Sequence, residues 1–207
     1  MHAKLPASVK ALAAELAELP SIGPRQAVRL AFHLIDKGPN RIAGLARAIA
    51  DLGAVKLCER CFFVHQNKHS LCDICANPAR NQNVIMVVEK ETDLISLENA
   101  KKFTGRYFIL GPMPKTGVLE DWQKLRLQNL KSIIAKNPPA GGSGGQVDEI
   151  ILGFNPTSAG DFNASAIAKE LTPLAKKISR LGIGLPSGGE IEFADDETLG
   201  GALERRS

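Results

Sequence analysis

The sequence is poor in aromatic residues and has no long hydrophobic run. Its 207 residues include only eight Phe, one Tyr and one Trp, so a core must be built mainly from Leu, Ile, Val and Ala. No apolar stretch approaches the ~18 residues that cross a bilayer. The N-terminal MHAKLPASVK also lacks the apolar segment of a secretory signal. These absences argue against a membrane protein and predict a cytoplasmic one.

Cysteine is also scarce, but its spacing is typical of a metal site. Two CxxC pairs separated by ten residues contain all four cysteines: Cys58, Cys61, Cys72 and Cys75. Each short turn can aim two thiolates at one point, so two turns supply the four ligands of a tetrahedral Zn²⁺. No ligand position is left open, which predicts a structural zinc; disulfides or a redox CxxC are the alternatives. His65 and His69, between the pairs, are expected to be solvent-exposed.

The charge is nearly balanced, with 26 Lys+Arg against 22 Asp+Glu and a net charge of +4. A nucleic-acid site would therefore need a local basic patch. Apolar residues at helical spacing predict three N-terminal helices, over residues 7–18, 25–36 and 41–52.

The turn Leu19–Pro24, which joins the first two helices, is similar to the helix-hairpin-helix module. Backbone N–H groups at the start of the second helix would attract phosphate without reading sequence. Arg25 and Arg29 lie four residues apart on one helical face and could add phosphate contacts. Ser21 stands where the module has its first glycine. The alternative interpretation is an ordinary helical hairpin with exposed arginines.

Strands and helices alternate from residue 84 onward. The predicted strands cover residues 84–88, 106–110 and 149–153, and the predicted helices cover 93–101, 120–135 and 161–177, with a possible break at Pro173. This order predicts a mostly parallel sheet with helices packed on it. The glycine-rich stretch 141–145 lacks a Gly-Lys-Ser/Thr ending, which favours a linker loop over a phosphate loop.

Acidic residues follow the first of these strands. Glu89 comes directly after it and Asp93 opens the next helix, at the sheet edge where sites of α/β proteins gather. The string VVEKETDLISLE is similar to the glutamate motif of Toprim domains, whose enzymes need further paired acids to hold Mg²⁺. After strand 149–153 only Asp161 is present. We therefore expect a non-catalytic acidic surface, or a helix-capping role for Asp93. A Mg²⁺-dependent nuclease or primase is the alternative.

The order of parts resembles the RecR family of bacterial recombination mediators. The similar strings are LPSIGPRQAVRLAFHLI, CERC…CDIC, VIMVVEKETDLISLE, LGFNPT and GIGLPSGGEIEFADDETLGGALERR. This resemblance implies an α/β multidomain fold with a helix-hairpin-helix at 1–53, a four-cysteine zinc finger at 54–78, a Toprim-like domain at 79–180 and an oligomerisation tail at 181–207. The chain departs from the family pattern at Ser21, at Gly111–Pro114, and after Asn155, where paired glutamates are missing.

The resemblance also implies a function. Such proteins bind DNA without catalysis, form a ring-like homo-oligomer, and act with RecO and in some species RecF. Together they help RecA displace single-strand-binding protein at gaps. Carried over by position, Arg25 and Arg29 would face DNA, and Glu89 and Asp93 would dock the partner protein. The segment Glu190–Asp196 resembles a Walker B strand but is expected to be structural or oligomeric.

Overall fold

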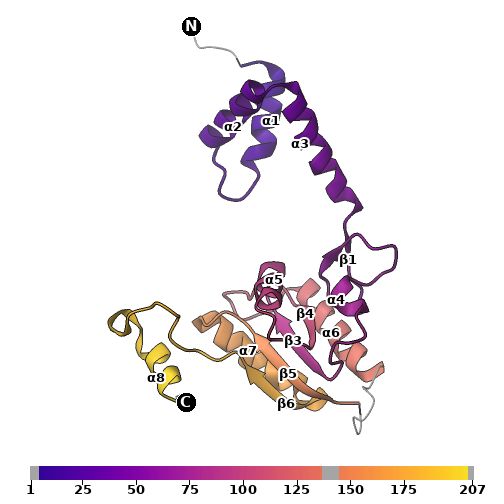
Figure 1. Ribbon diagram of the computed structural model, residues 1–207, viewed down its shortest axis with the longest axis vertical. Helices are drawn as coiled ribbons and strands as arrows, with labels where there is room; N and C mark the ends of the chain where they lie inside the picture. The colour runs from indigo at the N-terminus through magenta and orange to yellow at the C-terminus, as the bar shows by residue number, and fades with distance from the viewer. Residues whose placement is uncertain (1–4, 137–144, 205–207) are drawn as a thin grey trace. The chain divides into compact units, whose positions relative to one another are not determined.

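A computed structural model describes residues 5–136 and 145–204 and divides the chain into two units, Met1–Val55 and Lys56–Ser207 (Figure 1). Within these residues, no helix combines the length and the apolar character needed to span a bilayer. Residues 137–144, which contain most of the predicted glycine-rich loop, lie outside the described part.

The first unit is helical, as predicted. Its elements are α1 (Ala7–Ala17), α2 (Pro24–Lys37), α3 (Pro39–Asp51) and a short 3₁₀ turn, η1 (Leu52–Ala54). Pro24 and Pro39 each begin a helix, where a missing N–H does no harm. Gly38 ends α2 at φ +82°. Among the described residues of this unit, the fully buried hydrophobic side chains are small: Val9, Ala27 and Ala31. They let α1 and α2 pack closely.

The second unit begins with the cysteine-bearing segment. A two-residue antiparallel ladder joins β1 (Lys56–Leu57) to β2 (Val64–His65), and the one-turn helix α4 (Asp73–Ala76) follows. These elements are too short to form a hydrophobic core of their own. The segment therefore depends on its cysteines and on the sheet beside it.

A four-stranded parallel sheet forms the centre of this unit. Its strands are β3 (Val84–Val88), β4 (Arg106–Ile109), β5 (Val147–Gly153) and β6 (Ala175–Arg180), in the order β4-β3-β5-β6. Val87 stands opposite Phe108 on one side and Leu152 on the other. The central strand β3 is a continuous apolar run, VIMVV, because both faces of the sheet are covered there. The predicted α/β fold with a parallel sheet is confirmed.

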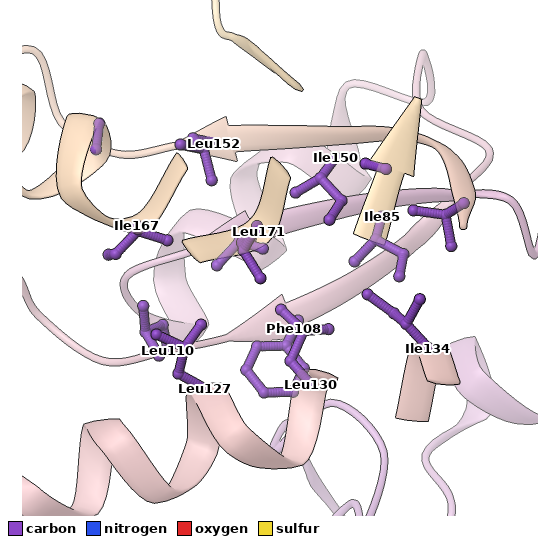
Figure 2. Packing of buried hydrophobic residues seen from close by; sticks show 14 of the residues in the cluster. Ile85, Phe108, Leu110, Leu127, Leu130, Ile134, Ile150, Leu152, Ile167 and Leu171 are labelled. Carbon is purple, nitrogen blue, oxygen red and sulfur yellow. The ribbon is translucent and has the colours of Figure 1, made fainter. Parts of the chain in front are cut away.

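The two faces of the sheet are covered by different elements. Helices α6 (Asp121–Lys136) and α7 (Ser158–Leu171) cover one face, whereas α5 (Glu91–Asn99) and the cysteine segment cover the other. On the first face, Leu127 and Leu130 of α6 point toward Leu110 and Phe108 of the sheet (Figure 2). Burial of each such side chain stabilises the fold by about 1.5–3 kcal/mol, and the loops at the edge of the sheet begin from this packed core.

The predicted helix over residues 161–177 is wrong at its C-terminal end. Helix α7 ends at Leu171, the 3₁₀ turn η2 (Thr172–Leu174) contains Pro173, and β6 follows as a fourth strand. Proline breaks the helical hydrogen-bonding pattern. The next residues pair with β5 instead: Lys176 and Lys177 form ion pairs of 2.7 and 2.9 Å with the β5 carboxylates of Asp148 and Glu149.

The C-terminal segment contains the 3₁₀ turn η3 (Ile191–Phe193) and helix α8 (Asp196–Glu204). A Walker B acid would end a buried strand, but the described residues here form a turn and a helix. The Asp195 carboxylate accepts hydrogen bonds from the Thr198 N–H (2.8 Å) and hydroxyl (3.0 Å), which caps α8. This capping agrees with a structural role for the segment.

Candidate functional site

The four cysteines come together at one buried point. Their Sγ atoms lie within 4.8 Å of one another, and none is in a disulfide. The Sγ atoms of Cys61 and Cys72 are 3.5 Å apart. Thiolates at 2.3 Å from a tetrahedral Zn²⁺ lie about 3.8 Å apart. The residues therefore fit a divalent metal ion held by four sulfur ligands.

Backbone groups prepare two of these sulfurs for negative charge. The Phe63 N–H donates to Cys61 Sγ and the Cys75 N–H to Cys72 Sγ, both at 3.5 Å. At each CxxC turn a backbone N–H thus points at a cysteine sulfur, and such hydrogen bonds help to orient metal ligands. The first turn is closed by the Phe62 N–H donating to the Cys58 carbonyl at 2.9 Å.

Four buried thiols cannot all ionise without a cation. The hydrogen bond with Cys58 raises the pKa of Cys61, and burial raises it further. Cys58 raises the pKa of Cys75 in the same way, whereas hydrogen bonds led by that from Cys61 lower the pKa of Cys58 itself. A divalent ion would remove this conflict, because it stabilises all four thiolates together.

Two arginines lie near this cluster. Arg60 donates to the Cys75 carbonyl at 3.2 Å. Arg106 is buried at the start of β4 and donates to the Gln82 carbonyl at 2.6 Å. Burial lowers the pKa of Arg106, and the charge of Arg60 lowers it further, while the negative charge of Cys75 opposes both effects. Positive charge beside four thiolates is favourable because a tetrathiolate site with a divalent ion is a net anion.

The two histidines between the cysteine pairs are not metal ligands in this arrangement. His69 is exposed, as predicted, and accepts from the Leu71 N–H. The expected exposure of His65 is wrong, because the residue is only 9% exposed and its Nδ1 accepts from the Asn67 N–H at 3.1 Å. Pairing of β1 with β2 turns this side chain inward, an orientation that the irregular sequence of the segment did not reveal.

The hairpin between α1 and α2 is the second candidate site. Ser21 adopts φ +66°, the left-handed conformation that glycine would take without strain. The Ile22 N–H donates back to the Leu19 carbonyl at 3.1 Å, which closes the turn. Despite the serine, the tight turn of the pattern is therefore formed.

Arg25 and Arg29 are both exposed at the N-terminal end of α2. A hollow of about 530 Å³ lies here, lined by Gly23, Pro24, Arg25, Gln26 and Arg29. Its two charged side chains are both cationic, and the first turn of α2 contains no acid. The positive end of the helix dipole and the two guanidinium groups therefore favour an anion at the same place.

The predicted acidic surface is only partly present. Glu89 is buried, with 6% of its surface exposed. Its Oε1 accepts from the backbone N–H (2.7 Å) and side-chain amide (2.9 Å) of Asn155, and its Oε2 accepts from the Met113 N–H (3.1 Å). The placement of Glu89 on an exposed surface is therefore wrong. Strand β3 ends inside the protein, and neighbouring loops cover the carboxylate.

Asp93 and Asp161, the other two acids of the proposed magnesium site, each interact with a different group. Asp93 Oδ2 accepts from the Lys90 N–H at 3.0 Å and so caps α5, and Asp161 forms an ion pair with Arg180. Over residues 5–136 and 145–204, the four cysteines are the only cluster of three or more His, Cys, Asp or Glu side chains close enough to share an ion. Glu89, Asp93 and Asp161 are therefore not brought together.

Asp93 also borders a cavity that the sequence did not indicate. The cavity has a volume of about 670 Å³ at the carboxyl ends of β5 and β6, and its lining includes Asp93, Asn155 and Arg180. Sequence reasoning missed Arg180 because it read the region before it as helix rather than strand. The strand sequence AKKISR does not alternate between buried and exposed residues, so no local pattern indicates a strand here.

Comparison with known proteins agrees with these parts. Residues 9–52 match the family model "RecR, helix-hairpin-helix", residues 83–182 match "Toprim domain", and residues 184–207 match "RecR, C-terminal". The recombination protein RecR of Frankia alni is 39% identical over 201 residues, which cover 96% of this chain and 95% of that protein. The RecR of Chloroflexus aggregans is 37% identical over 208 residues, covering 99% and 96%.

A helical hairpin, a four-cysteine cluster and a Toprim sheet in this order define a multidomain protein of DNA recombination and repair. Similarity over nearly the full length with 37–39% identity makes the assignment more specific. The chain belongs to the RecR family of recombination proteins.

Proposed function

We propose that this chain is a DNA-binding recombination mediator that contacts the phosphate backbone through its N-terminal hairpin and catalyses no reaction itself. The observation that carries the proposal is the exposed pair Arg25 and Arg29 at the start of α2, around a hollow without acids. Helix N-termini and guanidinium groups both bind phosphate oxygens, and neither reads base sequence. Such binding suits a protein that acts at gaps of any sequence.

The salt dependence of DNA binding tests this role. In duplex DNA, each phosphate contact contributes about 0.9 to the slope of log K against log salt. The double variant R25A/R29A should therefore bind more weakly and lose up to about 1.8 from the slope. The matched control is R41A/R47A, which removes two exposed arginines of α3. An unchanged slope in R25A/R29A, or equal losses in both variants, would contradict the hairpin as the contact surface.

We propose that the cysteine cluster binds Zn²⁺ as a structural ion. The proposal rests on the number, spacing and burial of the four sulfurs. When bound, the ion would hold together a segment whose strands contain two residues each. Cysteines outside disulfides are also consistent with a reducing, cytoplasmic compartment. Metal analysis of the purified chain should give one Zn²⁺ per chain, and C58S/C61S should give none.

We further propose that the protein acts with a RecO-like partner, and in some species a RecF-like one, to load RecA at single-stranded gaps. Asp93 beside the cavity is the candidate docking residue, while buried Glu89 would act by holding the neighbouring loops. D93A should weaken a RecO complex without unfolding the chain. A D93A complex as tight as wild type would place the docking surface elsewhere.

Oligomerisation is part of the same proposal. The first unit exposes large apolar side chains, among them Phe32, Ile35 and Ile49. A second copy of the chain, in a ring-like homo-oligomer, would cover them. Native mass spectrometry should show one assembly of several chains, and I49D should shift it toward smaller species. A monomer at micromolar concentration would exclude the ring.

A further inference from the structure

The metal segment and helix α6 are joined by one cation between two rings. The Arg126 guanidinium carbon lies 4.6 Å from the ring centre of Phe62 and 5.0 Å from that of Trp122. Arg126 also donates to the Ile109 carbonyl at 3.2 Å. The guanidinium is thus held by two cation–π contacts and a hydrogen bond to the edge strand.

On one side of this cation, the position of Phe62 depends on the metal ligands. Phe62 directly follows Cys61 and adopts φ +63°, a strained conformation for an aromatic residue. The turn around the first cysteine pair imposes this conformation. Phe62 also packs edge-on against Phe108, with ring centres 5.5 Å apart, and the Ile109 N–H donates to the Cys61 carbonyl at 2.9 Å. A metal ion that fixes Cys61 therefore fixes Phe62 as well.

On the other side, Trp122 covers the start of the loop after β4. A Cβ placed on Gly111 would lie 2.1 Å from the Trp122 ring, so the ring rests directly on the backbone of this glycine. Gly111 has φ +111°, a conformation essentially limited to glycine. The next residue in α6, Gln123, donates to the Pro112 carbonyl at 2.9 Å. The conformation of loop 111–120 thus depends on the positions of Trp122 and Gln123 in the first turn of α6.

We propose that Arg126 is a positioning residue that couples metal binding at the four cysteines to the conformation of loop 111–120. The contacts run from Cys61 through Phe62, Arg126 and Trp122 to Gly111. The loop lies at the carboxyl edge of the parallel sheet, where ligands and partners of such sheets bind. The metal would then organise this edge of the Toprim domain in addition to the cysteine segment. The inference rests on the proposed metal site and is independent of DNA binding.

Hydrogen–deuterium exchange of the full chain loaded with Zn²⁺ tests the coupling. In the wild type, removal of Zn²⁺ by excess chelator should speed exchange of the amides in residues 111–119 by about three- to fivefold, as expected when the cation–π contact between Arg126 and Phe62 is lost. In R126M with Zn²⁺ still bound, the same amides should already exchange faster, and chelation should add little. Trp122, the single tryptophan of the sequence, gives a second readout. Its emission should change on chelation in the wild type but not in R126M.

The control is K124M, which removes a cation of the same helix whose ammonium group pairs with surface Asp121. It should behave like the wild type. R126K keeps the charge without the planar stacking group and should give an intermediate loop exchange. If Zn²⁺ removal deprotects only residues 56–78, or if Zn²⁺-loaded R126M keeps residues 111–119 protected, the coupling is wrong while the metal site stands. If the wild type unfolds entirely when Zn²⁺ is removed, the exchange of residues 111–119 in Zn²⁺-loaded R126M decides whether Arg126 positions the loop. A chain that binds no Zn²⁺ would overturn both proposals.

Discussion

Glu89 holds Asn155 by both its backbone N–H, at 2.7 Å, and its side-chain amide, at 2.9 Å. The second oxygen of the same carboxylate accepts from Met113. One buried acid thereby ties the end of β3 to the loops that follow β4 and β5. In a Toprim enzyme an acid at this place would serve metal chemistry, but here its oxygens are occupied by three donors.

The first prediction concerns this carboxylate. E89Q should destabilise the fold by about 2–3 kcal/mol. The glutamine NH₂ group is a donor, and it would face the buried N–H donors of Asn155 or Met113 in place of a carboxylate oxygen. Urea denaturation measures the change. E91Q, in the first turn of α5, is the control and should change stability by less than about 0.5 kcal/mol. If E89Q kept the urea midpoint of the wild type but lost a Mg²⁺-dependent activity, the alternative of a nuclease or primase would be supported instead.

The second prediction concerns the hairpin. S21G should stabilise the first unit by roughly 0.5–1 kcal/mol, since relief of the left-handed conformation outweighs the greater freedom of glycine in the unfolded chain. S21A keeps the Cβ and should show no such gain. Thermal unfolding of both variants beside the wild type checks the difference. Equal stability of S21G and S21A would mean that Ser21 is not strained.

The third prediction concerns pH. The Ser179 hydroxyl donates to Glu149 at 2.6 Å and Lys177 pairs with it at 2.9 Å, and these contacts lower the pKa of the Glu149 carboxyl. Because the folded pKa lies below the unfolded one, this stabilisation is complete above the unfolded value and is lost as pH falls through the folded value.

E149Q should therefore be less stable than the wild type at pH 7 by at most about 1 kcal/mol, because the pair is partly exposed. The difference should shrink once the pH falls below the ordinary glutamate pKa of about 4.3. Denaturation midpoints across pH 3–7 would show it. A constant difference over that range would exclude the charge as its source.

The parts that the sequence predicted are those with local signals. The cysteine pairs, the hairpin around Leu19–Pro24 and the apolar strand at residues 84–88 each depend on a few neighbouring residues, and the structure contains all three. Strand β6 was missed because its lysines are equally typical of the exposed face of a helix. Their pairing with Asp148 and Glu149 of the neighbouring strand is seen only in the folded structure. The burial of Glu89 depends on Asn155, which lies 66 residues away. Such contacts cannot be read from periodicity.

We propose that this chain assists recombination on DNA without making or breaking bonds. The most direct measurement follows RecA assembly on gapped DNA coated with single-strand-binding protein, with Mg²⁺ and a RecO-like protein present. We predict that the wild type shortens the lag of RecA assembly, that R25A/R29A does so far less, and that the DNA strands keep their length throughout. An unchanged lag with the wild type, or DNA cleavage that disappears in E89Q, would contradict the account.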